Sequence, residues 1–399
     1  MNILKKAYCR TYQKIFRMAI PVLPYRKPEL YYSIGSIPAL LKKRNIFRVL
    51  VVTDKFLHES GALSPMLVAL ADAEISVYLY DEVIPNPTVS NAEAARQLYD
   101  ENRCEALIGF GGGSSIDCAK AVGARIARPG KSLQKMRGIL HILKKPPFTV
   151  AVPTTAGTGS ETTVTVVITD EATHEKYPIS DLCLIPDAAV LDPEVTKTLP
   201  PHITATTGID ALTHAVEAYI GGSSVRETRS AALECIRLVF ENIETAYNNG
   251  SDLTARKNML LAANLGGLAF SKSYVGYCHA VAHTLGGKYG IPHGLANAVL
   301  LPYVLDFYGK KIHKKLKQLA VYGGLCGDNT TPELAARIFT EKVRTLNRTM
   351  GIPEKLSGIC EEDIPTLSRS AAKEANPLYP VPVLLSAEEL EYFYRTVRE

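Results

Sequence analysis

The sequence predicts an α/β fold, in which an N-terminal domain with a parallel sheet is followed by an all-α C-terminal domain. Residues 47 to about 197 alternate short apolar, β-branched runs with helical patterns, as parallel strands and crossover helices do. After residue 200, long stretches with a period of 3.6 residues replace these runs. A chain of 399 residues also exceeds the usual size of one hydrophobic core. We therefore expect two domains, residues 1–198 and residues 199–399.

Short apolar runs mark the predicted strands, and longer periodic stretches mark the predicted helices. Each of the first three runs is followed by loop residues and then by a helical stretch. There is no internal repeat or low-complexity linker, so we expect the two halves to pack directly against one another. The predicted strands are residues 49–52, 77–80, 106–110, 148–152, 164–169 and 188–191. Helical stretches continue to the end of the chain, and examples are residues 210–219, 227–248, 254–270, 295–308, 332–350 and 387–397.

The first 25 residues form an arm in front of the first strand. Apolar residues alternate in it with basic ones at helical spacing, which predicts a basic amphipathic helix. It has no apolar stretch long enough for a signal peptide core or a transmembrane span. A membrane-surface anchor and an arm packed on the body of the protein both fit this pattern, and we expect the packed arm. The basic residues are Lys5, Lys6, Arg10, Lys14 and Arg17.

The composition excludes several classes of protein. A hydrophobic fraction of 46% and a charged fraction of 21% are those of an ordinary soluble globular protein. The net charge of +5 is modest, and Lys and Arg are spread along the chain, which argues against a nucleic-acid partner. The eight cysteines form no CxxC pair and have no regular spacing, so we expect neither a disulfide framework nor a thiolate metal cage. We expect a reducing, cytoplasmic location.

Two segments of small residues follow predicted strands. Residues 111–120, with Gly112, Gly113 and Ser114, open a helix, where free N–H groups and the helix dipole attract phosphate. Alone, a glycine turn fits a plain strand-to-helix connection equally well. Residues 153–161 are rich in hydroxyl groups and also follow a strand, so both segments would emerge on the same carboxyl edge of the sheet. Together they favour a dinucleotide site and a Rossmann-like first domain.

Asp54 stands at the end of the first predicted strand. A carboxylate there could accept hydrogen bonds from an adenosine ribose and repel a 2′-phosphate, which favours NAD over NADP. An N-cap for the following helix explains the same residue equally well. The sequence leaves both interpretations open.

Four histidines of the second half lie in or beside helical stretches of small residues. Asp210 and His214 are four residues apart, as are His279 and His283, so each pair shares one face of a helix. His293 follows at the start of another helix. Each histidine alone fits a hydrogen-bonded core position. The set favours a divalent cation, because one ion and one carboxylate satisfy several buried imidazoles at once, and such a site suits Fe(II) or Zn(II).

These motifs, taken in order, resemble those of the iron-containing (group III) alcohol dehydrogenase family, which is related to glycerol dehydrogenase and dehydroquinate synthase. The resemblance runs from about residue 28 onward, so the N-terminal arm lies outside it. It implies Fe²⁺, with Zn²⁺ as the alternative, bound by Asp210, His214, His279 and His293. It implies that His283 lies near the substrate but does not bind the metal. It also implies an NAD site lined by Asp54, Asn86, Gly112, Gly113, Ser114, Asp117, Thr154, Thr155, Thr158 and Lys176.

On this basis we expect a metal-dependent alcohol dehydrogenase or aldehyde reductase. It would transfer a hydride between a small alcohol or aldehyde and the nicotinamide in the cleft between the domains, with the metal acting as a Lewis acid on the substrate oxygen. His283 is the candidate proton relay to solvent, and a structural role for it is equally open. The family resemblance also implies a homodimer.

Other functions remain open. A glycerol-type polyol dehydrogenase and a lactaldehyde-type reductase are the nearest alternatives. A dehydroquinate-synthase-like lyase would need a phosphate-binding basic cluster near the histidines, and the sequence shows no obvious one. A metal-dependent phosphohydrolase would leave the two glycine- and threonine-rich loops unexplained. A catalytically inactive NAD-binding regulator is disfavoured because all four expected metal ligands are present.

Overall fold

The computed structural model describes residues 1–20, 23–172 and 175–399, which divide into two compact units. The α/β unit is Pro24–Leu199, and the helical unit is Pro200–Glu399 together with Met1–Leu23. The sequence division counted residues 1–25 with the α/β half. Their contacts place the arm in the helical unit instead, although residues 21 and 22 lie outside the described part.

The core of the α/β unit is a parallel sheet, with six strands in the described residues. At the centre of the sheet, Val51 pairs with Leu79 of the neighbouring strand on one side and with Ile108 of the neighbouring strand on the other. In spatial order the strands are β1 (Glu29–Tyr31), β9 (Ala188–Val190), β6 (Phe148–Pro153), β4 (Ala106–Gly111), β2 (Arg48–Val52) and β3 (Ser76–Tyr80).

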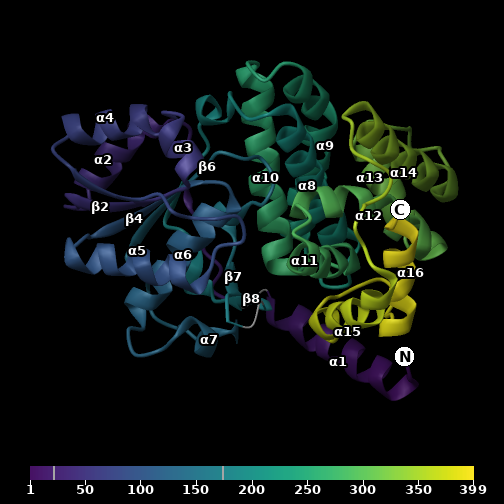
Figure 1. Ribbon diagram of the computed structural model, residues 1–399. Coiled ribbons are helices and arrows are strands. Elements are labelled where there is room, and N and C mark those ends of the chain that lie inside the picture. Colours follow the sequence, from purple (N-terminus) through teal and green to yellow (C-terminus); the bar gives the residue numbers. More distant parts are fainter. Residues whose placement is uncertain (21–22, 173–174) are drawn as a thin grey trace. The chain divides into compact units, whose positions relative to one another are not determined.

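Helices cover both faces of this sheet (Figure 1). Alternate residues of β2 point to opposite faces, so Val49 and Val51 belong to one buried cluster and Leu50 and Val52 to the other. The first cluster includes residues of α2 (Ile37–Lys42) and α4 (Ser64–Asp72), and the second includes residues of α5 (Val89–Glu101) and α6 (Gly113–Ala127). Two shorter helices of this unit are α3 (Lys55–Glu59) and α7 (Leu133–Met136).

The predicted strand at residues 164–169 is not part of the parallel sheet. It forms β7 (Thr165–Asp170), which pairs antiparallel with β8 (Glu175–Ser180), and β8 pairs with β5 (Gly138–Ile139). The reason is the short connection, because β8 begins five residues after β7 ends. So short a link allows only antiparallel neighbours, whereas a parallel pair needs a crossover of about a dozen residues or more.

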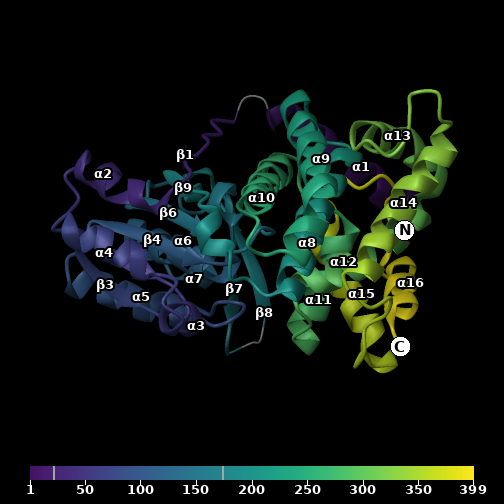
Figure 2. The same cartoon turned by 90° about the horizontal axis from the view of Figure 1, so that it is seen from above.

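The helical unit contains no strand in its described residues (Figure 2). The predicted fold class, a parallel-sheet α/β region followed by a helical one, is therefore confirmed. Among the residues that the structure describes, no helix is both long and apolar enough to cross a bilayer. The helices after residue 200 are α8 (Pro201–Ile220), α9 (Arg226–Asn248), α10 (Leu253–Ser273), α11 (Tyr277–Tyr289), α12 (His293–Tyr308), α13 (His313–Tyr322), α14 (Pro332–Thr349), α15 (Ile364–Ala375) and α16 (Ala387–Val397).

The arm forms helix α1 (Ile3–Ala19), as its periodicity predicts. One face is buried at Cys9 and Gln13. On that side Arg10 Nη1 donates to the carbonyl of Val381 at 2.7 Å, and Arg10 Nη2 donates to that of Pro382 at 3.0 Å. The arm is thus held by the segment between α15 and α16.

Candidate active site

Helix α8 carries two polar groups into the interior of the helical unit. Asp210 and His214, one turn apart, are 1% and 4% exposed. The helices around them approach closely because small residues line the contact. A Cβ on Gly208 would lie 2.7 Å from Ile243 Cδ1 and 2.9 Å from Met259 Cε, so a larger residue there would require these side chains to move.

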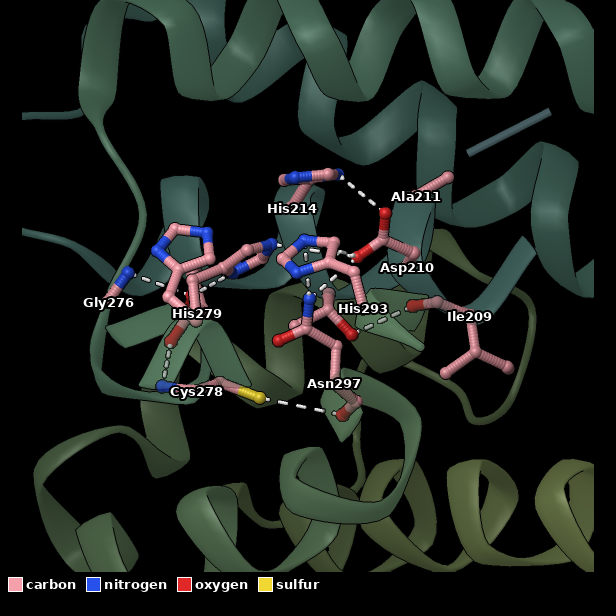
Figure 3. Close-up of polar contacts among 12 residues, drawn as sticks. Ile209, Asp210, Ala211, His214, Gly276, Cys278, His279, His293 and Asn297 are labelled. Carbon is pink, nitrogen blue, oxygen red and sulfur yellow. Dashed lines mark hydrogen bonds and ion pairs between the residues drawn. The ribbon is translucent and has the colours of Figure 1, made fainter. Parts of the chain in front are cut away.

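Helices α11 and α12 bring two more imidazoles to Asp210 (Figure 3). His279 Nε2 and His293 Nε2 lie 3.7 Å and 3.5 Å from Asp210 Oδ1. His214 Nδ1 lies 3.9 Å from Asp210 Oδ2. One ligand atom from each of these four residues falls within 4.8 Å of the other three. The structure thus brings together the four residues predicted as metal ligands.

The geometry and the chemistry of this cluster suit a divalent metal ion. Ligand atoms bonded at about 2.1 Å to a tetrahedral ion lie about 3.4 Å apart, close to the separations seen here. His279 Nε2 is buried and has no hydrogen-bond partner among the described residues, as expected for an atom that a metal would satisfy. Three imidazoles and one carboxylate are a donor set for Fe(II) or Zn(II).

The electrostatics of the cluster also favour a cation. Burial alone would raise the pKa of the Asp210 carboxyl, but the adjacent imidazoles of His214 and His293 hold it well below its usual range. Burial alone would lower the pKa of His279, but the neighbouring carboxylates of Asp210 and Glu217 raise it to about 9. The buried carboxylates therefore stabilise positive charge at this point.

Glu217 holds His279 in place, and the sequence analysis missed it. Its Oε2 accepts hydrogen bonds from His279 Nδ1 at 2.6 Å and from Gly276 N at 2.8 Å, and its Oε1 accepts one from Cys278 N at 2.9 Å. With Nδ1 held on Glu217, Nε2 is the ring nitrogen of His279 that would bind a metal, which would displace its proton. The signal was present in the sequence, since Glu217 follows Asp210 by two helical turns on the same face.

Asn297 is a second contact that the sequence analysis did not identify. It follows His293 by one turn of α12, and its Nδ2 donates to Asp210 Oδ1 at 2.7 Å and lies 3.1 Å from His293 Nε2 (Figure 3). The side chain is fully buried. Asn297 thereby fixes the carboxylate of Asp210 relative to His293.

His283 lies beside the cluster but is not one of its four members. Its ring stacks on that of His293 with 5.1 Å between centroids. Its Nδ1 is 2.6 Å from Glu374 Oε1. This position agrees with a histidine near the metal site that does not bind the metal.

In the α/β unit, the two predicted nucleotide loops lie side by side. Thr154 N donates to Gly111 O at 3.0 Å, where β4 and β6 end. Gly111 has φ +148°, and a Cβ there would lie 2.5 Å from Ser115 Oγ, so glycine is required. The N-cap of α6 is Gly112, which has no side chain that could accept hydrogen bonds from the N–H groups of the first turn. The other close pairs are Gly112 with Thr155 and Gly113 with Thr158.

Three more predicted residues meet near the start of α6. Asn86 has φ +60°, a conformation that asparagine tolerates better than most residues. Its backbone N donates to Ser114 Oγ at 3.3 Å, and its Oδ1 accepts from Lys176 Nζ at 2.7 Å. Lys176 comes from β8, so segments far apart in sequence converge here.

Both carboxylate oxygens of Asp117 accept hydrogen bonds from other groups of the protein. Ser160 Oγ donates to its Oδ1, and Val167 N donates to its Oδ2 at 2.8 Å. Burial raises the pKa of this carboxyl, although the nearby Lys120 opposes the shift. Lys120, which the sequence analysis missed, is 2% exposed and donates to Thr163 O and Thr165 O at 3.0 Å and 2.7 Å. Through their contacts with Ser160, Asp117 and Lys120 hold the loop at residues 153–161 against α6.

Asp54 is the N-cap of α3, and its Oδ1 accepts from Leu57 N at 3.0 Å. The capping interpretation is therefore realised in the structure. Its other oxygen is not used by this cap, so the ribose interpretation stays a prediction.

Comparison with known proteins decides the family. Residues 31–193 match iron-containing alcohol dehydrogenase, and residues 204–397 match the Fe-containing alcohol dehydrogenase family, C-terminal. The chain belongs to the iron-containing alcohol dehydrogenase family. Membership confirms the predicted resemblance and the predicted class of enzyme, an oxidoreductase acting on CH–OH groups.

Individual members of the family are similar over most of their length. Alcohol dehydrogenase 4 of Schizosaccharomyces pombe is 38% identical over 350 residues, which cover 85% of this chain and 81% of that protein. A crystal structure of 1,3-propanediol oxidoreductase has a TM-score of 0.89 at 34% identity and covers 94% of this chain and 99% of that one. Sulfoacetaldehyde reductase from Bifidobacterium kashiwanohense, solved in complex with NAD⁺, has a TM-score of 0.82 at 28% identity over 94% and 98% of the two chains.

Proposed function

We propose that the chain is an iron-dependent, NAD-linked dehydrogenase that interconverts a short-chain alcohol and its aldehyde. The observation that carries this proposal is the buried cluster of Asp210, His214, His279 and His293, found in a member of the iron-containing alcohol dehydrogenase family. The metal would be held by these four side chains. Fe²⁺ is favoured over Zn²⁺ by the family, since the donor set suits both ions.

The roles of the residues follow from their contacts. A divalent ion held at the cluster would polarise the substrate oxygen as a Lewis acid. Asp210 supplies the negative charge, and Glu217 keeps the proton of His279 on Nδ1. His283, stacked beside His293, is the candidate to exchange a proton through its second ring nitrogen, because Glu374 occupies its Nδ1.

Two findings support NAD as the redox cofactor. The two glycine- and threonine-rich loops meet at the carboxyl ends of β4 and β6, where open parallel sheets bind ligands. In addition, the structurally similar sulfoacetaldehyde reductase was solved with NAD⁺. The dinucleotide would be held by these loops together with Asn86, Ser114 and Lys176, and it would supply the hydride acceptor for alcohol oxidation.

Short alcohols and diols are the proposed substrates, because similar proteins include 1,3-propanediol dehydrogenases and alcohol dehydrogenases. Glycerol and lactaldehyde remain the nearest alternatives. We further propose that the protein is cytoplasmic and forms a homodimer. Light scattering of the purified protein would test the oligomeric state.

One experiment tests the core of the proposal. The protein is purified without oxygen, its bound metal is determined, and absorbance of reduced nicotinamide is followed with a panel of short alcohols and aldehydes and with both NAD(H) and NADP(H). Metal-dependent turnover of a short alcohol with NAD⁺ is expected. Tight binding of metal and NAD⁺ without turnover of any substrate would contradict the proposal and favour a lyase or a regulator.

A further inference from the structure

His283 has its own supporting contacts, separate from those of the metal cluster. Glu374 Oε1 lies 2.6 Å from His283 Nδ1, and it also accepts the hydroxyl of Tyr379 at 2.7 Å. His283 comes from α11, Glu374 from α15, and Tyr379 from the segment that follows α15. One carboxylate oxygen thus receives two donors from two different segments of the helical unit.

The charge state of each group fits this arrangement. Burial alone would raise the pKa of Glu374, but His283 and Tyr379 lower it below its ordinary value, so the carboxylate stays ionised. Burial and the same carboxylate raise the pKa of Tyr379 well above its usual value, so its hydroxyl stays a donor. An ionised acceptor makes both hydrogen bonds charge-assisted and therefore strong.

The contacts continue outward to the N-terminal arm. Gln13 Nε2, on the buried face of α1, donates to Tyr379 O at 2.7 Å and to Pro377 O at 3.1 Å. The ring centroids of Phe16 and Tyr274 are 4.9 Å apart, and those of Tyr274 and Tyr379 are 6.1 Å apart. Both the backbone and the ring of Tyr379 are therefore supported from α1, either directly or through one residue.

We propose that Glu374 is the positioning residue of His283, and that α1, through Gln13, holds the segment from which Tyr379 fixes Glu374. The carboxylate keeps the proton on Nδ1 of His283, so the lone pair of Nε2 is directed away from Glu374 with the ring stacked on His293. The arm, which lies outside the family resemblance, thereby becomes part of the scaffold of the site. The expected changes in kcat rest on the proposed function, whereas the expected changes in the tautomer of His283 do not.

The first test replaces Glu374. In full-length protein labelled with ¹⁵N-histidine and loaded with Zn²⁺, which is diamagnetic, the ring nitrogens of His283 report the tautomer. Glu374→Leu is expected to mix the two tautomers and to lower kcat about tenfold with little change in KM or metal content. Glu374→Gln retains a carbonyl acceptor and is expected to restore the Nδ1–H signal in part. An unchanged His283 signal in both variants would overturn the proposal.

A milder variant covers the case in which Glu374→Leu does not fold. Tyr379→Phe removes only the hydroxyl, and it is expected to shift the His283 signal and to lower kcat about threefold. A His283 signal and a kcat equal to those of the unmodified protein would show that Tyr379 does not act through Glu374.

The second test addresses the arm. Gln13→Ala removes both hydrogen bonds to the 377–379 segment, and it is expected to shift the His283 signal in the same direction as Tyr379→Phe. Lys14→Ala, on the exposed side of the same helix, is the matched control and should leave the signal unchanged. Equal signals in both arm variants would refute the link to α1. If no alcohol is turned over by the unmodified protein, the proposed function fails, while the nitrogen signals still decide this inference.

Discussion

Each unit contains an aspartate whose carboxylate is surrounded by polar groups of the protein, and the two carboxylates have different environments. Asp117 in the α/β unit has both oxygens bonded, to Ser160 and to Val167 N, and its pKa is raised chiefly by burial. Asp210 in the helical unit faces imidazoles at 3.5 Å to 3.9 Å, and its pKa is held low. A carboxylate whose oxygens are both bonded to groups of the fold supports the structure, whereas one surrounded by three imidazoles is prepared for an ion.

The strongest test of this difference removes one imidazole of the cluster. His293→Ala is expected to abolish metal retention and to lower kcat by about 10³-fold or more, because the Lewis acid contributes several kcal/mol. Affinity for NADH, measured by fluorescence, should be retained. His313→Ala, on α13 and outside the cluster, is the control. An active, metal-free His293 variant would rule out the metal mechanism.

A smaller effect is expected at the residue behind the cluster. Glu217→Gln keeps the size of the side chain but removes the charge that His279 Nδ1 contacts at 2.6 Å. Metal affinity, measured by competition with a chelator, should fall about 10- to 100-fold. Unchanged affinity would mean that Glu217 serves only to bind the backbone of Gly276 and Cys278.

A substitution beside Asp117, in the α/β unit, should affect folding instead of metal binding. Lys120→Met leaves the carbonyl groups of Thr163 and Thr165 without their donor. We expect a loss of about 3 kcal/mol in the free energy of unfolding and weaker NADH binding, with metal content unchanged. Denaturant unfolding measures the first, and Lys135→Met, an exposed lysine of α7, is the control. Loss of metal in the Lys120 variant would show that the two sites are not independent.

The same lysine predicts a dependence on pH. Burial lowers the pKa of Lys120 to about 8, against an ordinary value of 10.5. Between these two values the unfolded chain binds a proton that the folded chain does not, so stability rises with pH at up to about 1.4 kcal/mol per unit. Other groups also titrate there, so the quantity to compare is the stability of the unmodified protein minus that of Lys120→Met. A flat difference between pH 8 and 10.5 would contradict the assigned shift.

The smallest effect concerns a carboxylate whose role is still shared between two interpretations. Asp54→Ser keeps an oxygen that can cap α3, so stability should change by less than about 0.5 kcal/mol. Losing the charge should raise the affinity for NADP relative to NAD about tenfold if Asp54 meets the ribose. Unchanged cofactor preference in a stable variant would leave Asp54 with the cap alone.

Local patterns predicted many of the elements and indicated a metal site among the histidines, because both depend on short-range spacing, whereas the choice of the four ligands came from the family resemblance. Four-residue spacing placed Asp210 with His214 on one helix face, and glycine after a strand marked the loop at residues 111–113. The run at residues 164–169 was assigned to the wrong sheet, since its pattern is the same in either sheet and only the connection distinguishes them.

The supporting residues were harder to predict, for a physical reason. Glu374 contacts a histidine 91 positions earlier, and no local periodicity links the two. Lys120 follows Asp117 by three residues, but a lysine on a helix is usually solvated, and only the packing of the segment at 160–165 shows it to be buried. Residues that contact a ligand come in motifs, whereas residues that hold them depend on the tertiary fold.

The anchoring of α1 also has a consequence for the order in which the chain can fold. Arg10 and Val381, whose hydrogen bond holds the helix, are 371 positions apart. At ribosomal speeds of about 5 to 20 residues per second, α1 waits on the order of 20 to 70 s for its binding surface to be made. The α/β unit, Pro24–Leu199, is complete long before that and can fold as a contiguous block. Helix α1 is therefore synthesised well before the segment that holds it, and it is among the last elements to reach its native contacts.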